Sequence, residues 1–144
     1  MRCVVISAIG TALALAACPS GGMRGPSLVQ LLVDPDEFAG SQVRVQGYLS
    51  DAGNLSLFLT KEHADTWDHV SSVPVSDATP DGYIIQNCVG HHAVVDGTLQ
   101  KRSDAPLFVG KSGVALMYTI TSVRRILVFR DGRLEQCWPK PSGE

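Results

Sequence analysis

The stretch SQVRVQGYLS, residues 41–50, decides the expected fold because its apolar residues recur at every second position. Val43, Val45 and Leu49 fall on one side of an extended chain, and the residues that alternate with them are polar or amphipathic. This alternation predicts a strand with one buried face. Gly47 interrupts the apolar side, which indicates a bend or a β-bulge at that position.

The segment that follows predicts the second arm of a β-hairpin. Gly53 and Asn54 are turn residues, and the run NLSLFLT then repeats the alternation. Leu55, Leu57 and Leu59 share one face of this second strand. Two alternating runs joined by such a turn are typical of an antiparallel hairpin.

Three further β-rich runs predict the remaining strands. They are SSVPVS at 71–76, HHAVVDGTLQ at 91–100 and VALMYTITSVRRILVF at 114–129. Pro74 is of the kind found in edge strands. The dipeptide Asp131-Gly132 predicts a tight turn and an additional C-terminal hairpin, whose second arm is RLEQCW.

The segments between the strands are expected to be short connections. KEHADTWDHV at 61–70 is polar and fits either a short helix or a loop. The segment 77–90 predicts a connection with one helical turn, and 101–113 predicts a loop. Before the first strand, Ser27 is a suitable N-cap for a short leader helix that carries Leu28, Leu31 and Leu32 on one face.

These segments predict a mainly β domain over residues 27–138. Its expected form is a small five-stranded barrel with a short N-terminal leader helix and an extra C-terminal hairpin. Gly47 and Gly97 lie inside strands, where glycine permits the sharp bends that closure requires. These features leave both an OB-fold and an SH3-like barrel open, and residues 139–144 predict a disordered tail.

The stretch 34–50 resembles the opening of a family of small bacterial OB-fold proteins. The matching positions are Pro35, Phe38, Gly40, Val43, Val45, Gly47, Tyr48 and Leu49. Later positions that fit the same pattern are Leu57, Phe58, Leu59, Gly90, Val95, Gly97, Thr98, Ile120, Val123 and Ile126. Ala93 and Leu99 depart from it modestly, since the family has valine and an aromatic residue at these two positions. The resemblance spans residues 27–128 and implies an OB-fold-like domain, but it implies no particular ligand. Nucleic acid is not an expected partner, because the net charge is −2 and only 6% of the residues are aromatic.

The N-terminal segment has the character of a bacterial export signal. Met1-Arg2 is followed by an apolar run at 3–17, which is too short to span a bilayer as a helix but has the length of a signal-peptide core. The run ends in Leu15-Ala16-Ala17-Cys18, which resembles the lipobox of bacterial lipoproteins. In that family the cysteine is acylated and becomes the new N-terminus. The alternative is an ordinary secretory signal with an incidental cysteine.

The lipobox interpretation divides the N-terminal region into a signal peptide at 1–17 and a flexible tether at 18–26, with the lipid on Cys18. Removal of residues 1–17 takes away one arginine and no acid, so the charge changes from −2 to −3. Two or three acyl chains anchor a protein stably to a membrane. Pro19 follows the cysteine in place of the aspartate that retains lipoproteins at the inner membrane. The expected localisation is therefore the cell envelope, at the periplasmic face of the outer membrane.

Two cysteines remain in the expected mature chain. Cys88 and Cys137 form an even pair in an oxidising compartment, which favours a disulfide between them. The alternative is two buried free thiols.

No motif in the chain predicts catalysis, a metal or a cofactor. His91 and His92 are adjacent in a predicted strand and point to opposite faces, and His63 and His69 are not on one face of a helix. The chain has no zinc-ligand spacing, nucleophile elbow or phosphate-binding glycine motif. The acidic stretch around Glu62 fits a solvated loop.

The expected function is therefore that of a membrane-anchored binding or interaction module and not that of an enzyme. OB-folds bind ligands on the second and third strands and the flanking loops, which directs attention to Phe58 and Trp67. The expected partners are a protein, a peptide or a glycan of the envelope. The alternative is a structural or envelope-stress lipoprotein without a small ligand.

Overall fold

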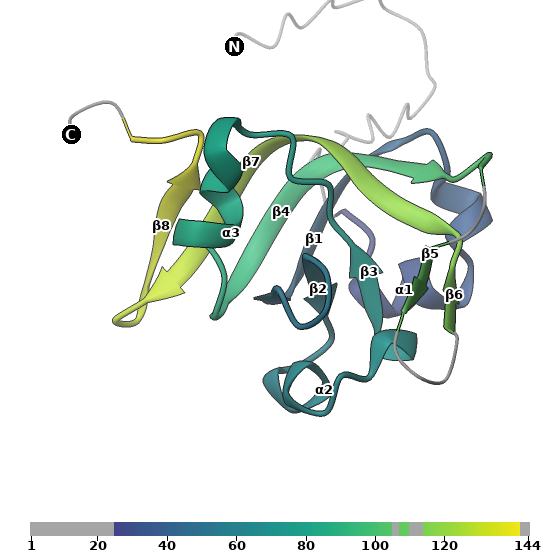
Figure 1. Ribbon diagram of the computed structural model, residues 1–144. Helices are drawn as coiled ribbons and strands as arrows, with labels where there is room; N and C mark the ends of the chain where they lie inside the picture. Colours follow the sequence, from purple (N-terminus) through teal and green to yellow (C-terminus); the bar gives the residue numbers. More distant parts are fainter. Residues whose placement is uncertain (1–24, 105–106, 110–113, 142–144) are drawn as a thin grey trace, which may run out of the picture.

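A computed structural model describes residues 25–104, 107–109 and 114–141 (Figure 1). The predicted signal peptide, Cys18 and most of the predicted tether lie outside these residues, as does the end of the predicted tail at 142–144.

The strands form a six-stranded antiparallel sheet with the order β3-β2-β1-β4-β7-β8, so the predicted mainly β class is confirmed. Its strands are β1 (Gln42–Ser50), β2 (Ser56–Phe58), β3 (Ser72–Pro74), β4 (His91–Lys101), β7 (Tyr118–Arg130) and β8 (Arg133–Trp138). In Figure 1, β4 and β7 run side by side as long curved strands, and the β7–β8 hairpin extends from one end. β5 (Leu107–Val109) and β6 (Val114–Leu116) form a separate two-stranded sheet.

Short helices connect the strands. They are α1 (Leu28–Val33), η1 (Pro35–Phe38), α2 (Lys61–Asp65), η2 (His69–Ser71), η3 (Pro80–Gly82) and α3 (Tyr83–Asn87). α1 is the predicted leader helix, and Ser27 caps it as expected. The Ser27 hydroxyl accepts from the Gln30 N–H at 3.2 Å, and the Gln30 side chain accepts from the Ser27 N–H at 2.8 Å, which completes a capping box.

The strands do not close into the predicted five-stranded barrel, because two different segments meet the edge of β7 that faces away from β4. β4 pairs with one edge of β7, and β8 pairs with the C-terminal part of the other edge, from Ile126 to Arg130. Near the N-terminal end of β7, the same edge meets Val75, the residue after β3, through a single parallel bridge to Ile120. β3 itself has only three residues, too few for a ladder that would seal the sheet.

One prediction about the strands is corrected. Gly47 is not a bulge, since β1 and β4 keep their register through the Gly47–Ala93 pair. A Cβ at Gly47 would lie 2.5 Å from the Phe58 carbonyl oxygen, so the close approach of β2 requires glycine there. The irregularity lies in β4, where the register with β7 shifts between Asp96 and Thr98.

The region predicted as a loop followed by one long strand is also different. β5 lies inside the predicted loop 101–113, and the predicted strand 114–129 is split into β6 and β7 at Met117. Arg124 and Arg125 lie within β7. β5 and β6 have three residues each. The alternation of apolar and polar residues in so short a strand is too brief to detect in the sequence.

The hydrophobic core lies between the sheet and the helices α1 and α3. The strands contribute Val45, Val95 and Val128, which are fully buried. α1 contributes Leu31 and α3 contributes Ile84 to the same cluster. Residues that alternate with these core positions therefore lie on the outer face of the sheet.

Candidate functional site

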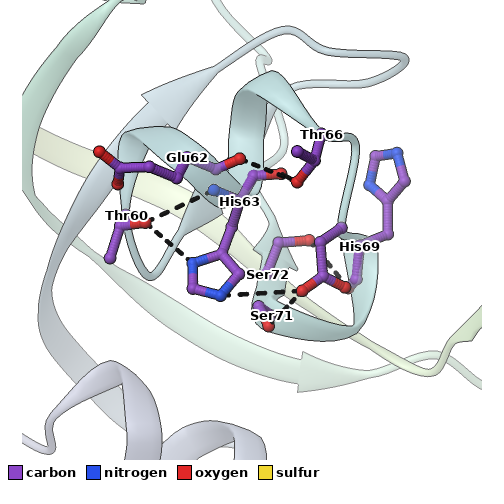
Figure 2. Close-up of polar contacts among 8 residues, drawn as sticks. Thr60, Glu62, His63, Thr66, His69, Ser71 and Ser72 are labelled. Carbon is purple, nitrogen blue, oxygen red and sulfur yellow. Dashed lines mark hydrogen bonds and ion pairs between the residues drawn. The ribbon is translucent and has the colours of Figure 1, made fainter.

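The segment from Thr60 to Ser72, which we call the Trp67 loop, holds the most exposed aromatic side chain among the described residues. It consists of α2, a turn and η2. Thr60 caps α2, because its hydroxyl accepts from the His63 N–H at 3.4 Å and lies 2.9 Å from His63 Nδ1 (Figure 2). The loop thus begins with a fixed polar contact.

Trp67 occupies a position at which helices usually place glycine. It follows the C-cap Thr66 and has a φ of 57°, in the left-handed region. The Trp67 N–H donates to the Ala64 carbonyl at 3.1 Å, and the Asp68 N–H donates to the His63 carbonyl at 2.8 Å. This pair of bonds defines a Schellman motif, whose left-handed residue is most often glycine. A bulky side chain there costs about 1–2 kcal/mol, so the backbone does not favour tryptophan at this position.

The indole of Trp67 does not fill the core either. Trp67 is 59% exposed, and Val70 in the same loop is 68% exposed. Phe58, the other predicted contact residue, is fully buried in β2. Phe58 is therefore covered and presents no surface to a partner. Trp67 and Val70 form the exposed apolar part of the Trp67 loop.

His69 lies beneath this surface in an unusual environment. It is only 3% exposed, and neither ring nitrogen has a hydrogen-bond partner among the residues that the structure describes. Its ring centroid is 5.6 Å from that of Phe58. Burial lowers the pKa of the His69 imidazole, and the nearby Asp68 carboxylate opposes that effect. Burial therefore favours the neutral form of His69.

Polar contacts tie the rest of the loop together (Figure 2). The Asp68 carboxylate accepts from the Ser71 hydroxyl at 2.8 Å and lies 3.8 Å from His63 Nε2. The Ser72 hydroxyl donates to the His69 carbonyl at 3.0 Å. In Figure 2 the His69 ring points away from these contacts. These contacts link residues of the Trp67 loop to one another.

An apolar groove of about 240 Å³ adjoins the loop. It is lined by Leu31 and Leu32 of α1, by Val73 and Pro74 of β3, and by Leu116 and Tyr118. Val70 and Met117, which is 38% exposed, also line it. The groove and the Trp67 loop therefore share Val70.

The adjacent histidines His91 and His92 have different neighbours in the structure. His92 stacks edge-on against Tyr48 with ring centroids 5.3 Å apart, while His91 Nε2 lies 3.4 Å from Arg130 Nε. Within residues 25–104, 107–109 and 114–141, no three His, Cys, Asp or Glu side chains converge to hold a metal ion.

Cys88 and Cys137 form a disulfide, as the sequence favoured. Both residues are buried, and their Cα atoms are 5.9 Å apart. The bond joins the end of α3 to β8 across 49 residues of chain. Cys18 lies outside the described residues. No helix in the described part of the chain has the length and apolarity to cross a membrane.

One charged cluster has no counterpart in the sequence-based predictions. Asp96 on β4 lies between Arg44 on β1 and Arg125 on β7, because the strand register sets these residues directly opposite one another. No spacing in the sequence reveals such a triad, since its members come from three separate strands.

Comparisons with protein-family models, with curated proteins and with solved structures each found no match to this chain.

Proposed function

We propose that this protein is a lipoprotein, anchored through Cys18 at the periplasmic face of the outer membrane, whose domain binds a partner in the cell envelope. The partner class is a protein, peptide or glycan, and the domain is neither an enzyme nor a nucleic-acid-binding module. The anchor rests on the lipobox-like sequence Leu15-Ala16-Ala17-Cys18.

The domain itself is proposed to be an OB-fold-like module. Five of its strands, β1, β2, β3, β4 and β7, follow the antiparallel order expected for this class, and β8 is the extra C-terminal arm. The parallel bridge between Val75 and Ile120 supports this proposal, because it brings the third of these strands to the fifth.

The observation that carries the binding proposal is the exposure of Trp67 at a position that disfavours tryptophan. Its side chain fills no core site, and its backbone conformation costs free energy. Tyrosine and tryptophan are enriched at binding hot spots because they bury a large area with few rotatable bonds. A contact function explains why tryptophan stands where glycine is more stable.

A capture experiment with envelope extracts and with glycan arrays tests this proposal. The full chain carrying Cys18→Ala serves as bait, beside the same chain with Trp67→Gly. The matched control is Phe129→Ser, which removes another aromatic side chain, 40% exposed, from the β7–β8 hairpin. We expect to capture a protein or glycan that binds equally well to the bait with Trp67 and to the bait with Phe129→Ser. The same species should bind the Trp67→Gly bait at least tenfold more weakly, because loss of a binding hot spot costs about 2 kcal/mol.

The alternative, a structural or envelope-stress lipoprotein without a small ligand, predicts a different result. In that case each captured protein or glycan would bind equally well to the chain with Trp67 and to the chain with Trp67→Gly. Equal capture by both baits would contradict the binding proposal.

A further inference from the structure

Arg44 and Arg125 flank one buried carboxylate, that of Asp96, and Arg124 lines the same groove. Arg44 Nε lies 2.8 Å from Asp96 Oδ1, and Arg125 Nε donates to Asp96 Oδ2 at 2.8 Å. The Asp96 side chain is 12% exposed, whereas those of Arg44 and Arg125 are 40% and 42% exposed. A single carboxylate thus orients two guanidinium groups that remain accessible to solvent.

Arg124 adds a further positive charge to this cluster. It lines a groove of about 590 Å³ together with Arg44, Asp96 and Arg125. Arg124 is exposed and makes no ion pair with an acidic side chain of the described residues. Glu37 lines the adjoining hollow beside Arg44, so arginines still outnumber carboxylates here. The cluster is positive although the whole chain has a net charge of −2.

The chain enters the domain over this same face. Gly25 and Pro26 line the groove beside the arginines. Gly25 crosses the backbone of Arg44 so closely that a Cβ there would lie 2.2 Å from the Arg44 carbonyl oxygen. Cys18 precedes Gly25 by seven residues, which span at most about 25 Å when fully extended. A lipid on Cys18 therefore keeps the bilayer surface within about 25 Å of the point at which the chain joins the cluster.

We propose that the face formed by Arg44, Arg124 and Arg125 docks on the anionic phospholipid headgroups of the membrane that holds the anchor. This inference rests on the proposed lipidation of Cys18. An anionic bilayer attracts each nearby arginine or lysine by an amount equivalent to about a fivefold change in binding constant. The short tether supplies the high local concentration that such a weak attraction needs.

The test uses the lipidated protein reconstituted into vesicles. One fluorophore is placed at Gln42→Cys, in the groove, and in a second protein at Gln86→Cys, on α3 at the core side of the sheet. Both residues are exposed. Quenching by a headgroup-linked quencher is compared in vesicles of neutral phosphatidylcholine and in vesicles that also contain phosphatidylglycerol. We expect stronger quenching at position 42 than at 86, only with phosphatidylglycerol, and its loss at high salt.

Charge variants make the result specific to the cluster. Arg124→Gln should lower the docking constant about fivefold, because it removes one exposed charge and leaves Asp96 paired. Arg133→Gln removes an equal charge from the β7–β8 hairpin and should leave docking unchanged. Equal quenching at positions 42 and 86, no dependence on phosphatidylglycerol, or equal effects of the two arginine variants would overturn the proposal. If Cys18 is not lipidated, the protein will instead fail to co-sediment with vesicles, which is a separate outcome.

Discussion

At the scale of single residues, Trp67 and His69 show how a loop combines exposure with burial. Trp67 points outward from a left-handed backbone position, and His69, two residues later, is almost completely covered. A Cβ on Gly53 of the β1–β2 turn would lie 3.5 Å from His69 Nε2 and 3.6 Å from Trp67 Cζ3. The two side chains therefore pack beside the same turn, and each carries a distinct prediction.

Replacement of Trp67 by glycine should change the free energy of unfolding by no more than about 1 kcal/mol. Glycine relieves the left-handed backbone, which offsets the loss of the partly covered indole. Trp138 provides the contrast, since its indole N–H donates to the Val123 carbonyl at 3.3 Å and its ring packs on the core. Trp138→Ala should cost about 3 kcal/mol or more. Urea unfolding measures both, and a large loss for Trp67→Gly would show that the indole has a structural role.

Stability should decrease as the pH falls below about 6.5, because His69 is more basic in the unfolded chain than in the fold. Its depressed folded pKa means that the unfolded chain binds the proton first. The contribution of neutral His69 is complete above pH 6.5 and is lost as the pH falls through the folded pKa.

His69→Phe removes this titration while it retains an aromatic ring in the same site. Thermal unfolding between pH 7 and pH 5 should therefore show a smaller decrease for His69→Phe than for the unaltered protein. His92→Gln, on the sheet, is the control. Parallel pH profiles for the unaltered protein and His69→Phe would contradict the assignment.

At the scale of elements, the β7–β8 hairpin illustrates a local signal that succeeds. Asp131 and Gly132 have φ values of 49° and 75°, as a two-residue type I′ turn requires. The dipeptide therefore predicts the turn without any knowledge of the fold. The same hairpin occupies part of the β7 edge, which contributes to the incomplete closure of the sheet.

The disulfide ties this hairpin to α3. Reduction of Cys88–Cys137 should lower the free energy of unfolding by about 4 kcal/mol, because the bond closes a loop of 49 residues in the unfolded chain. Urea unfolding with and without reductant measures the change. The double variant Cys88→Ala/Cys137→Ala should be destabilised and insensitive to reductant. An unchanged midpoint on full reduction would show that the bond contributes little.

At the scale of the whole molecule, the proposed anchor and the domain are expected to make separate contributions. Cys18→Ala should release the protein from membranes into the soluble fraction, because it removes the proposed acylation site. Fractionation followed by immunoblotting measures the release. Cys88→Ala is the control, since its sulfur lies in the domain and its loss should leave membrane attachment intact. Sedimentation of Cys18→Ala with membranes to the same extent would contradict the lipobox interpretation.

Several features follow from local patterns in the amino-acid sequence. The leader helix follows from Ser27 and its neighbours, β1 from the alternation of Val43, Val45 and Leu49, and the last hairpin from Asp131-Gly132. The cysteine count favoured the disulfide once Cys18 was assigned to lipid. These signals work because helix capping, strand periodicity and turn conformation are properties of adjacent residues.

Other features depend on which distant segments become neighbours in the folded chain. These features are visible in the tertiary structure and not in the sequence. Phe58 and Trp67 are both aromatic residues near one loop, yet β2 is covered on both faces and buries Phe58, while Trp67 stays exposed. Strand register brought Arg44, Asp96 and Arg125 together from three strands. The edge of β7 pairs with β8 along one part and meets Val75 at Ile120, so the sheet does not close into a barrel. Burial and long-range pairing arise from the packing of distant segments, and no local pattern specifies them.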